Sequence, residues 1–169
     1  MKKMIIILYL LGGLICIVLL IYIIGLFLPT ERIVSRKGHF NTSPEVLYNI
    51  VADNNNWQYR TGLKDLKIIK STNELEVWDE ISEDGSSIRF RTLEKRPYSF
   101  YSFHMEAKMF TGYWTGAFES DEKGGTIFTA TEHIRVHNPF IKTLSYLFFD
   151  VGKFMDSYQY DLQKKIESL

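Results

Sequence analysis

Residues 87–136 read SIRFRTLEKRPYSFYSFHMEAKMFTGYWTGAFESDEKGGTIFTATEHIRV, and this stretch indicates the fold class. It is rich in β-branched and aromatic residues, which are enriched in strands. Turn-forming residues interrupt it at Arg96-Pro97 and at residues 121–125, so the runs between them are short and evenly spaced. This spacing predicts an antiparallel meander. The four expected strands are Ser87–Glu94, Tyr98–Lys108, Gly112–Ser120 and Thr126–Val136.

The sequence before this stretch adds strands and two short helical segments. Further strands are expected at residues 32–40, Leu66–Ile69 and Glu74–Ile81. After the first of them, Thr42 or Ser43 can cap a short helix, with Pro44 in its first turn. That helix is expected to end near Asp53, and a second helical or turn segment surrounds Trp57.

The sequence after residue 136 predicts a C-terminal helix of about 30 residues. Asn138 is a suitable N-cap, Pro139 suits the first helical position, and apolar residues recur at steps of three and four from Leu144 to Leu169. The apolar stripe must be buried, and the sheet is the partner available for it. We therefore expect an α+β domain over residues 31–169, in which a curved antiparallel sheet wraps around this helix.

The N-terminal segment from Met4 to Leu28 contains 25 residues and no charge. As a helix it would extend about 37 Å, which is enough to cross a hydrocarbon core of about 30 Å. A cleaved signal peptide is the alternative, but its apolar core is shorter and is followed by small residues. Here bulky residues precede Pro29, so we expect residues 1–30 to be an uncleaved transmembrane anchor.

Charge and cysteine content limit the orientation and the partners of the domain. Lys2 and Lys3 favour a cytoplasmic N-terminus, whereas basic residues from Arg32 to Lys37 favour the opposite orientation. We expect a single-pass membrane protein with its domain on the extracytoplasmic side. Without the first two lysines the chain is close to neutral, so no nucleic-acid partner is expected. The only cysteine, Cys16, lies in the apolar segment, which excludes an intramolecular disulfide and a thiolate zinc cluster.

Several segments of the chain resemble the START/Bet v 1-like superfamily, also called SRPBCC. Residues 40–53 (FNTSPEVLYNIVAD) followed by Trp57 resemble its opening, and residues 124–129 (GGTIFT) resemble its turn into the last strand. Residues 162–167 resemble the end of its final helix, and Leu28-Pro29 resembles the end of the span in a membrane-anchored, polyketide cyclase/dehydrase-like subgroup. The resemblance implies the helix-grip fold and an internal cavity for lipids, sterols, quinones or other apolar molecules.

Large apolar side chains on the strands and the C-terminal helix are the candidate lining of such a cavity. For any single one of them an ordinary core position is the favoured interpretation, but as a group they favour a pocket. The candidates are Trp57, Trp78, Phe90, Phe103, Trp114, Phe118, Phe128, Phe148, Met155 and Tyr158. Arg60 lies near the expected cavity mouth, where it would pair with an anionic head group or face solvent.

Catalytic signals are weak in this sequence. No HExxH, GxSxG, P-loop or GxGxxG pattern is present, so we expect no catalytic residue, metal or cofactor. A cluster of His104, Glu106 and Glu132 is the one acid/base or metal-binding candidate. The favoured alternative is a solvated face, or one polar group whose hydrogen bonds are satisfied inside the cavity. His133 is expected to face outward with Thr129 and Thr131.

The expected function is a membrane-anchored binding module that holds a hydrophobic ligand, such as a lipid or isoprenoid. Its partners would be that small molecule and the bilayer, which residues 4–28 enter. Two alternatives remain open: a cyclase- or hydrolase-like enzyme that uses His104 or Glu132, and a ligand-free interaction protein.

Overall fold

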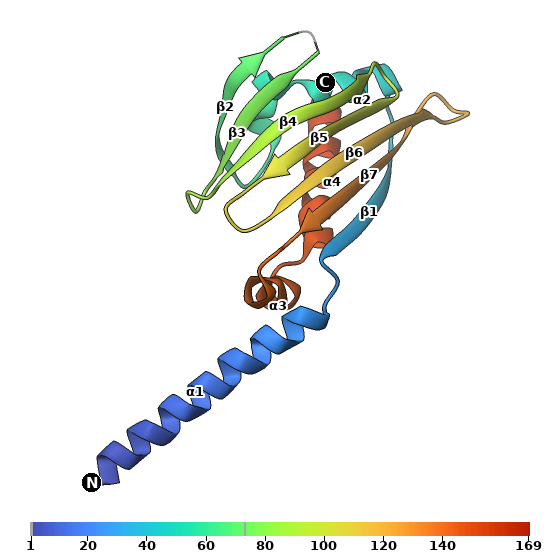
Figure 1. The fold of residues 1–169 in the computed structure, drawn as a ribbon. Coiled ribbons are helices and arrows are strands. Elements are labelled where there is room, and N and C mark those ends of the chain that lie inside the picture. The colour runs from blue at the N-terminus through green and yellow to red at the C-terminus, as the bar shows by residue number, and fades with distance from the viewer. Residues whose placement is uncertain (1, 73) are drawn as a thin grey trace.

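The computed structural model describes residues 2–72 and 74–169. In this part of the chain, seven antiparallel strands form one curved sheet in the order β1-β7-β6-β5-β4-β3-β2 (Figure 1). Successive strands pair from β2 to β7, and β1 completes the sheet by pairing with β7. The expected antiparallel meander is therefore confirmed. The strands are β1 (Glu31–Phe40), β2 (Leu63–Ser71), β3 (Glu76–Ser82), β4 (Ser87–Arg96), β5 (Phe100–Glu106), β6 (Thr111–Ser120) and β7 (Thr126–Arg135).

Two short helical segments follow β1, as the sequence predicts. The Ser43 hydroxyl accepts a hydrogen bond from the Val46 amide and caps α2 (Pro44–Ala52). The Asp53 carboxylate accepts one from the Asn55 amide and begins the 3₁₀ helix η1 (Asn54–Tyr59). Both segments lie at the end of the sheet near the C-terminus (Figure 1).

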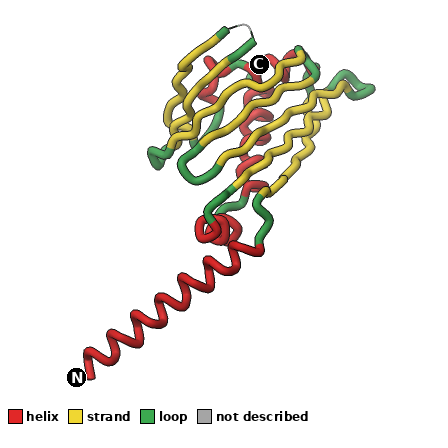
Figure 2. The backbone as a smooth tube through the Cα atoms, viewed as in Figure 1, coloured by secondary structure: helices red, strands yellow, loops and turns green. Residues whose placement is uncertain are grey.

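The C-terminal segment forms two helices, α3 (Pro139–Phe148) and α4 (Val151–Glu167), so the prediction of one continuous helix is wrong. Asn138 caps α3 as expected. The break occurs because Asp150 is a second N-cap, whose carboxylate accepts a hydrogen bond from the Lys153 amide at 3.1 Å. α4 alone runs along the inner face of the sheet, while α3 lies beside the end of the N-terminal helix (Figure 2).

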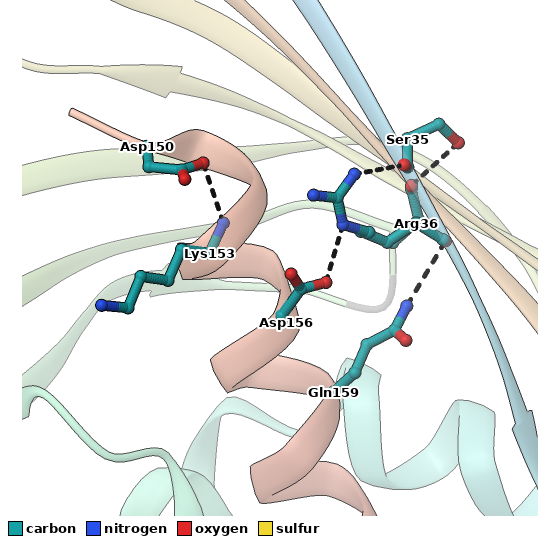
Figure 3. A network of polar contacts seen from close by, with 7 residues as sticks. Ser35, Arg36, Asp150, Lys153, Asp156 and Gln159 are labelled. Carbon is teal, nitrogen blue, oxygen red and sulfur yellow. Dashed lines mark hydrogen bonds and ion pairs between the residues drawn. The ribbon is translucent and has the colours of Figure 1, made fainter. Parts of the chain in front are cut away.

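Polar contacts hold α4 against β1 (Figure 3). Arg36 Nε donates to Asp156 Oδ1 at 2.7 Å, and Gln159 Nε2 donates to the Arg36 carbonyl at 3.3 Å. The Gln159 side chain packs directly against the glycine of β1, because a Cβ at Gly38 would lie 2.7 Å from Gln159 Oε1. This helix on the concave side of a curved sheet is the helix-grip arrangement, which confirms the predicted α+β fold.

The N-terminal helix α1 (Lys2–Phe27) projects away from the sheet (Figure 1). It is long and apolar enough to cross a membrane, which makes it a candidate span. Gly25 is the one residue within 2–27 that is buried, and the rest of the helix exposes apolar side chains along its length.

Candidate functional site between the C-terminal helix and the sheet

Aromatic side chains from neighbouring strands form a continuous layer on the inner face of the sheet. Trp78 lies opposite Phe90 in the ladder, and their rings stack with centroids 5.3 Å apart. Phe103 lies opposite Trp114, and this pair stacks at 4.9 Å. The layer continues to Phe128, whose ring centroid lies 6.1 Å from that of Trp114. Side-chain alternation puts these residues on one face, because each strand contributes every second position.

Most residues of the predicted lining lie in this interior. Trp78, Phe90, Trp114, Phe118, Phe128 and Met155 are buried, and Trp57, Phe103 and Tyr158 are half-buried against them. Phe148 does not belong to the set: it lies on α3 and is 82 % exposed. The error follows from the break at Asp150, since residues before the break no longer face the sheet.

A buried ion pair lies at the end of the aromatic layer near η1. Arg60 Nη1 and Nη2 donate to the two carboxylate oxygens of Glu80 at 2.6 and 2.7 Å. Trp78 Nε1 also donates to Glu80, at 3.1 Å, and the Arg60 guanidinium lies over the Tyr158 ring at 5.5 Å. Arg60 is therefore neutralised by an internal carboxylate, and is neither a surface arginine nor free to bind an anionic head group.

The backbone after η1 is tied to α4 by one buried carboxylate. Asp161 accepts hydrogen bonds from the amide and the hydroxyl of Thr61, at 2.7 and 2.8 Å. These contacts fix the segment that carries Arg60 against α4, so the ion pair and the helix are positioned together.

Two polar groups face the interior without a protein partner. Glu132 lies on the inner face of β7, between Trp114 and Val34 in the ladder, and is 7 % exposed. Among residues 2–72 and 74–169, the inner carboxylates of Glu76 and Glu80 accept hydrogen bonds from Asn54 and Arg60, whereas that of Glu132 accepts none. Burial first, and the negative charge of Glu80 second, raise the pKa of Glu132 from 4.5 to about 7. The buried Tyr101 hydroxyl likewise has no hydrogen-bond partner in the described part of the chain.

The interior is closed by its own aromatic side chains. The Trp114 ring lies along the strand above Gly116, where an added Cβ would lie 2.3 Å from the ring. Two hollows of the described residues lie on the outer surface of the domain. One is lined by residues that include Asp79 and Arg89, and the other includes His39 and Asp121. The aromatic-lined cavity therefore stays a prediction.

The candidate cluster of His104, Glu106 and Glu132 is not assembled. His104 lies in one cross-strand row with Tyr113 and His133 on the outer face of the sheet, whereas Glu132 lies on the inner face. The outward direction of His133 is confirmed, and its ring stacks on Tyr113 at 3.9 Å. Within the described residues, no group of three His, Cys, Asp or Glu side chains is placed to hold a metal ion.

The alternation of residues along β3 and β7 is enough to predict that polar side chains face the interior. Glu76, Trp78 and Glu80 alternate on one face of β3, and Glu132 shares the phase of Phe128 on β7. A carboxylate in phase with buried aromatic residues indicates an inward polar group. The pairing of Arg60 with Glu80 had no such signal, because it depends on how η1 lies against the sheet.

Comparisons with known proteins show the fold. No protein-family model matches the chain, and no curated protein matches it. Among solved structures, the Zhui aromatase/cyclase from Streptomyces sp. R1128 is similar, with a TM-score of 0.71 and 9 % identity. That match covers 81 % of this chain and 94 % of the other.

Two further solved structures have the same arrangement. A START superfamily protein from Mycobacterium smegmatis has a TM-score of 0.62 and 17 % identity, over 80 % of this chain and 97 % of that one. Norcoclaurine synthase from Thalictrum flavum has a TM-score of 0.66 and 10 % identity, over 82 % and 88 % of the two chains. The domain therefore has the START/Bet v 1-like, or SRPBCC, fold.

Proposed function

We propose that this chain is a membrane-anchored module that binds an apolar small molecule, such as a lipid or isoprenoid, between α4 and the inner face of the sheet. The observation that carries the proposal is the buried Tyr101 hydroxyl, which has no hydrogen-bond partner among the described residues and lies in an aromatic interior that also holds Glu132. Buried polar groups without partners are rare in native proteins and call for a physical reason. A bound ligand with an apolar body and one hydrogen-bonding group would provide the missing partner.

The aromatic layer would provide most of the binding free energy. Removing apolar surface from water is worth about 25 cal/mol per Å². Glu132, whose pKa is about 7, would orient the polar end of the ligand by a hydrogen bond. The proposed lining is Trp57, Trp78, Phe90, Phe103, Trp114, Phe118, Phe128, Met155 and Tyr158.

Entry of a ligand would require a side chain to move. Trp114 is the candidate, because its ring occupies the space above Gly116, next to Phe128. Interior side chains can change rotamer even though the time-averaged core is densely packed. A cavity of this kind is a minor conformation that the ligand makes dominant.

Membrane anchoring through α1 is the second part of the proposal. A signal peptide would be removed, yet the folded domain contacts the end of this helix. Thr143 Oγ1 donates to the Ile21 carbonyl at 2.8 Å, and Lys142 Nζ donates to the Leu28 carbonyl at 3.1 Å. These contacts favour a retained helix, which would keep the domain beside a source of apolar ligands.

An enzyme acting in the same interior is the second candidate function, and Glu132 favours it. A buried carboxyl with a pKa of about 7 is suited to general acid or base catalysis at neutral pH. Two of the similar structures are named as a cyclase and a synthase. His104, which faces outward, has no place in this version.

Native mass spectrometry of the full-length chain tests the binding proposal. The protein is incubated with vesicles of phosphatidylethanolamine that contain farnesol and is then solubilised in detergent. Its mass is measured after the detergent has been removed in the spectrometer. We expect a bound species, and we expect its fraction to rise in Trp114→Leu because the smaller side chain frees space above Gly116. Tyr113→Leu is the matched control, since Tyr113 lies on the outer face of the same strand.

Two outcomes would contradict the proposal. Only empty protein in every sample would favour a ligand-free interaction protein. An equal bound fraction in Trp114→Leu and Tyr113→Leu would place the bound molecule outside the sheet–helix interior. A melting curve of each variant confirms that it is folded.

A further inference from the structure

The C-terminal end of α3 exposes a contiguous apolar cluster. Leu147, Phe148 and Phe149 are 67, 82 and 48 % exposed. Three consecutive large apolar residues at the surface are unusual in soluble proteins and mark an interaction site. α3 itself, with the sequence PFIKTLSYLF, contains no acidic residue.

Close packing fixes α3 against the last turns of α1. A Cβ at Gly25 would lie 1.9 Å from the Pro139 carbonyl oxygen, so the helices touch through backbone atoms at this point. Thr143 also donates a hydrogen bond to the Ile21 carbonyl. Lys142 donates one to the Leu28 carbonyl, which has no partner within α1 because it lies beyond the end of the helix. The position of α3 along α1 is therefore set between Ile21 and Leu28.

Arg32 fixes the exposed end of α3. Its Nη1 donates to the carbonyl oxygens of Ser145 and Phe149, both at 3.1 Å. Its guanidinium also lies over the Tyr146 ring, 4.6 Å from the centroid. The apolar cluster is thus presented by an anchored helix end rather than by a free loop.

The length of α1 places α3 at the boundary of a bilayer. Twenty-six helical residues extend about 39 Å, which exceeds a hydrocarbon core of about 30 Å by roughly six residues. The hydrogen bond from Thr143 on α3 reaches Ile21, six residues before the end of α1 at Phe27. When α1 spans the membrane, α3 therefore lies where acyl chains meet head groups.

We propose that α3 lies in the membrane interface and inserts Leu147, Phe148 and Phe149 among the lipid acyl chains, as a second contact with the bilayer. The inference rests on the proposed anchoring by α1. The occupant is lipid rather than another protein, because the cluster continues the apolar surface of the span itself.

Site-directed spin labelling of the full chain tests this inference. In a Cys16→Ser background, single cysteines are introduced by Phe148→Cys, Leu20→Cys and Tyr160→Cys, and the labelled protein is placed in phosphatidylcholine vesicles. Leu20 is exposed on the part of α1 that would lie within the hydrocarbon core. Collisions with oxygen report acyl-chain contact, and collisions with a polar nickel complex report water. Tyr160, on α4, is 62 % exposed and serves as the aqueous control.

We expect the oxygen-to-nickel ratio at residue 148 to match that at residue 20 and to exceed that at residue 160. A ratio at residue 148 equal to that at residue 160 would overturn the inference. Dipolar broadening between labels at residue 148 would also overturn it, because the cluster would then be a contact between two copies of the chain. A water-like ratio at residue 20 would instead show that the anchoring has failed. Leu147→Cys gives a second position for the same measurement.

Discussion

Glu132 is the side chain whose titration should be visible in the stability of the whole domain. Its pKa is 4.5 when exposed and about 7 in the fold, because burial and the nearby charge of Glu80 oppose ionisation. Between these values the folded state binds the proton and the unfolded state does not, so the free energy of unfolding falls as pH rises. The total loss is about 3 kcal/mol, and stability from this group is fully present only below pH 4.5.

We expect Glu132→Gln to remove this pH dependence of the free energy of unfolding and to be more stable than the parent chain at pH 8. Melting of the full chain in detergent micelles across this range measures it.

Glu106→Gln is the control for that measurement, because Glu106 is exposed. If Glu132→Gln and the parent chain lose stability in parallel as pH rises, Glu132 is not the titrating group. The same residues show what sequence can reveal at this scale. Alternation along β7 gives the direction of Glu132, but its lack of a partner depends on which side chains of β3, β6 and α4 surround it.

At the level of elements, strand pairing was predictable and helix continuity was not. Each strand has local turn signals at its ends, such as Asp84-Gly85, and the meander then follows from chain order. The C-terminal segment has one apolar period throughout, but Asp150 caps a new helix inside it. The cap at Asp150 therefore ends the continuous helix, and the residues before it pack against α1 instead of the sheet.

Contact between α1 and α3 gives an element-scale prediction. Gly25→Leu should separate the two helices, since even a Cβ would lie 1.9 Å from the Pro139 carbonyl oxygen. Overpacking of this kind costs about 1–3 kcal/mol. Gly12→Leu is the matched control in the same helix, because nothing lies within 4 Å of a Cβ there. We expect a spin label at residue 148 to become more mobile in Gly25→Leu and to be unchanged in Gly12→Leu. Equal mobility in both variants would show that α3 is held without this contact.

For the whole molecule, the side of the membrane is the open prediction. The charges around the span conflict, with lysines before it and Arg32 and Arg36 after it, and the fold is the same on either side. In the Cys16→Ser background, we expect Tyr160→Cys to react with a membrane-impermeant maleimide in intact cells. Reaction only after the cells are opened would place the domain in the cytoplasm, and the proposed interior would then face cytoplasmic ligands.

Three residues, 28–30, separate the end of α1 from the start of β1. Fully extended, they reach about 10 Å, and Lys142 and Arg32 hold both ends of this connection to α3. With α1 in a bilayer as proposed, these contacts would keep the domain from swinging away from the lipid surface. Any cargo would be collected and released within a single leaflet, and delivery to a neighbouring membrane would require the two bilayers to approach within one domain diameter.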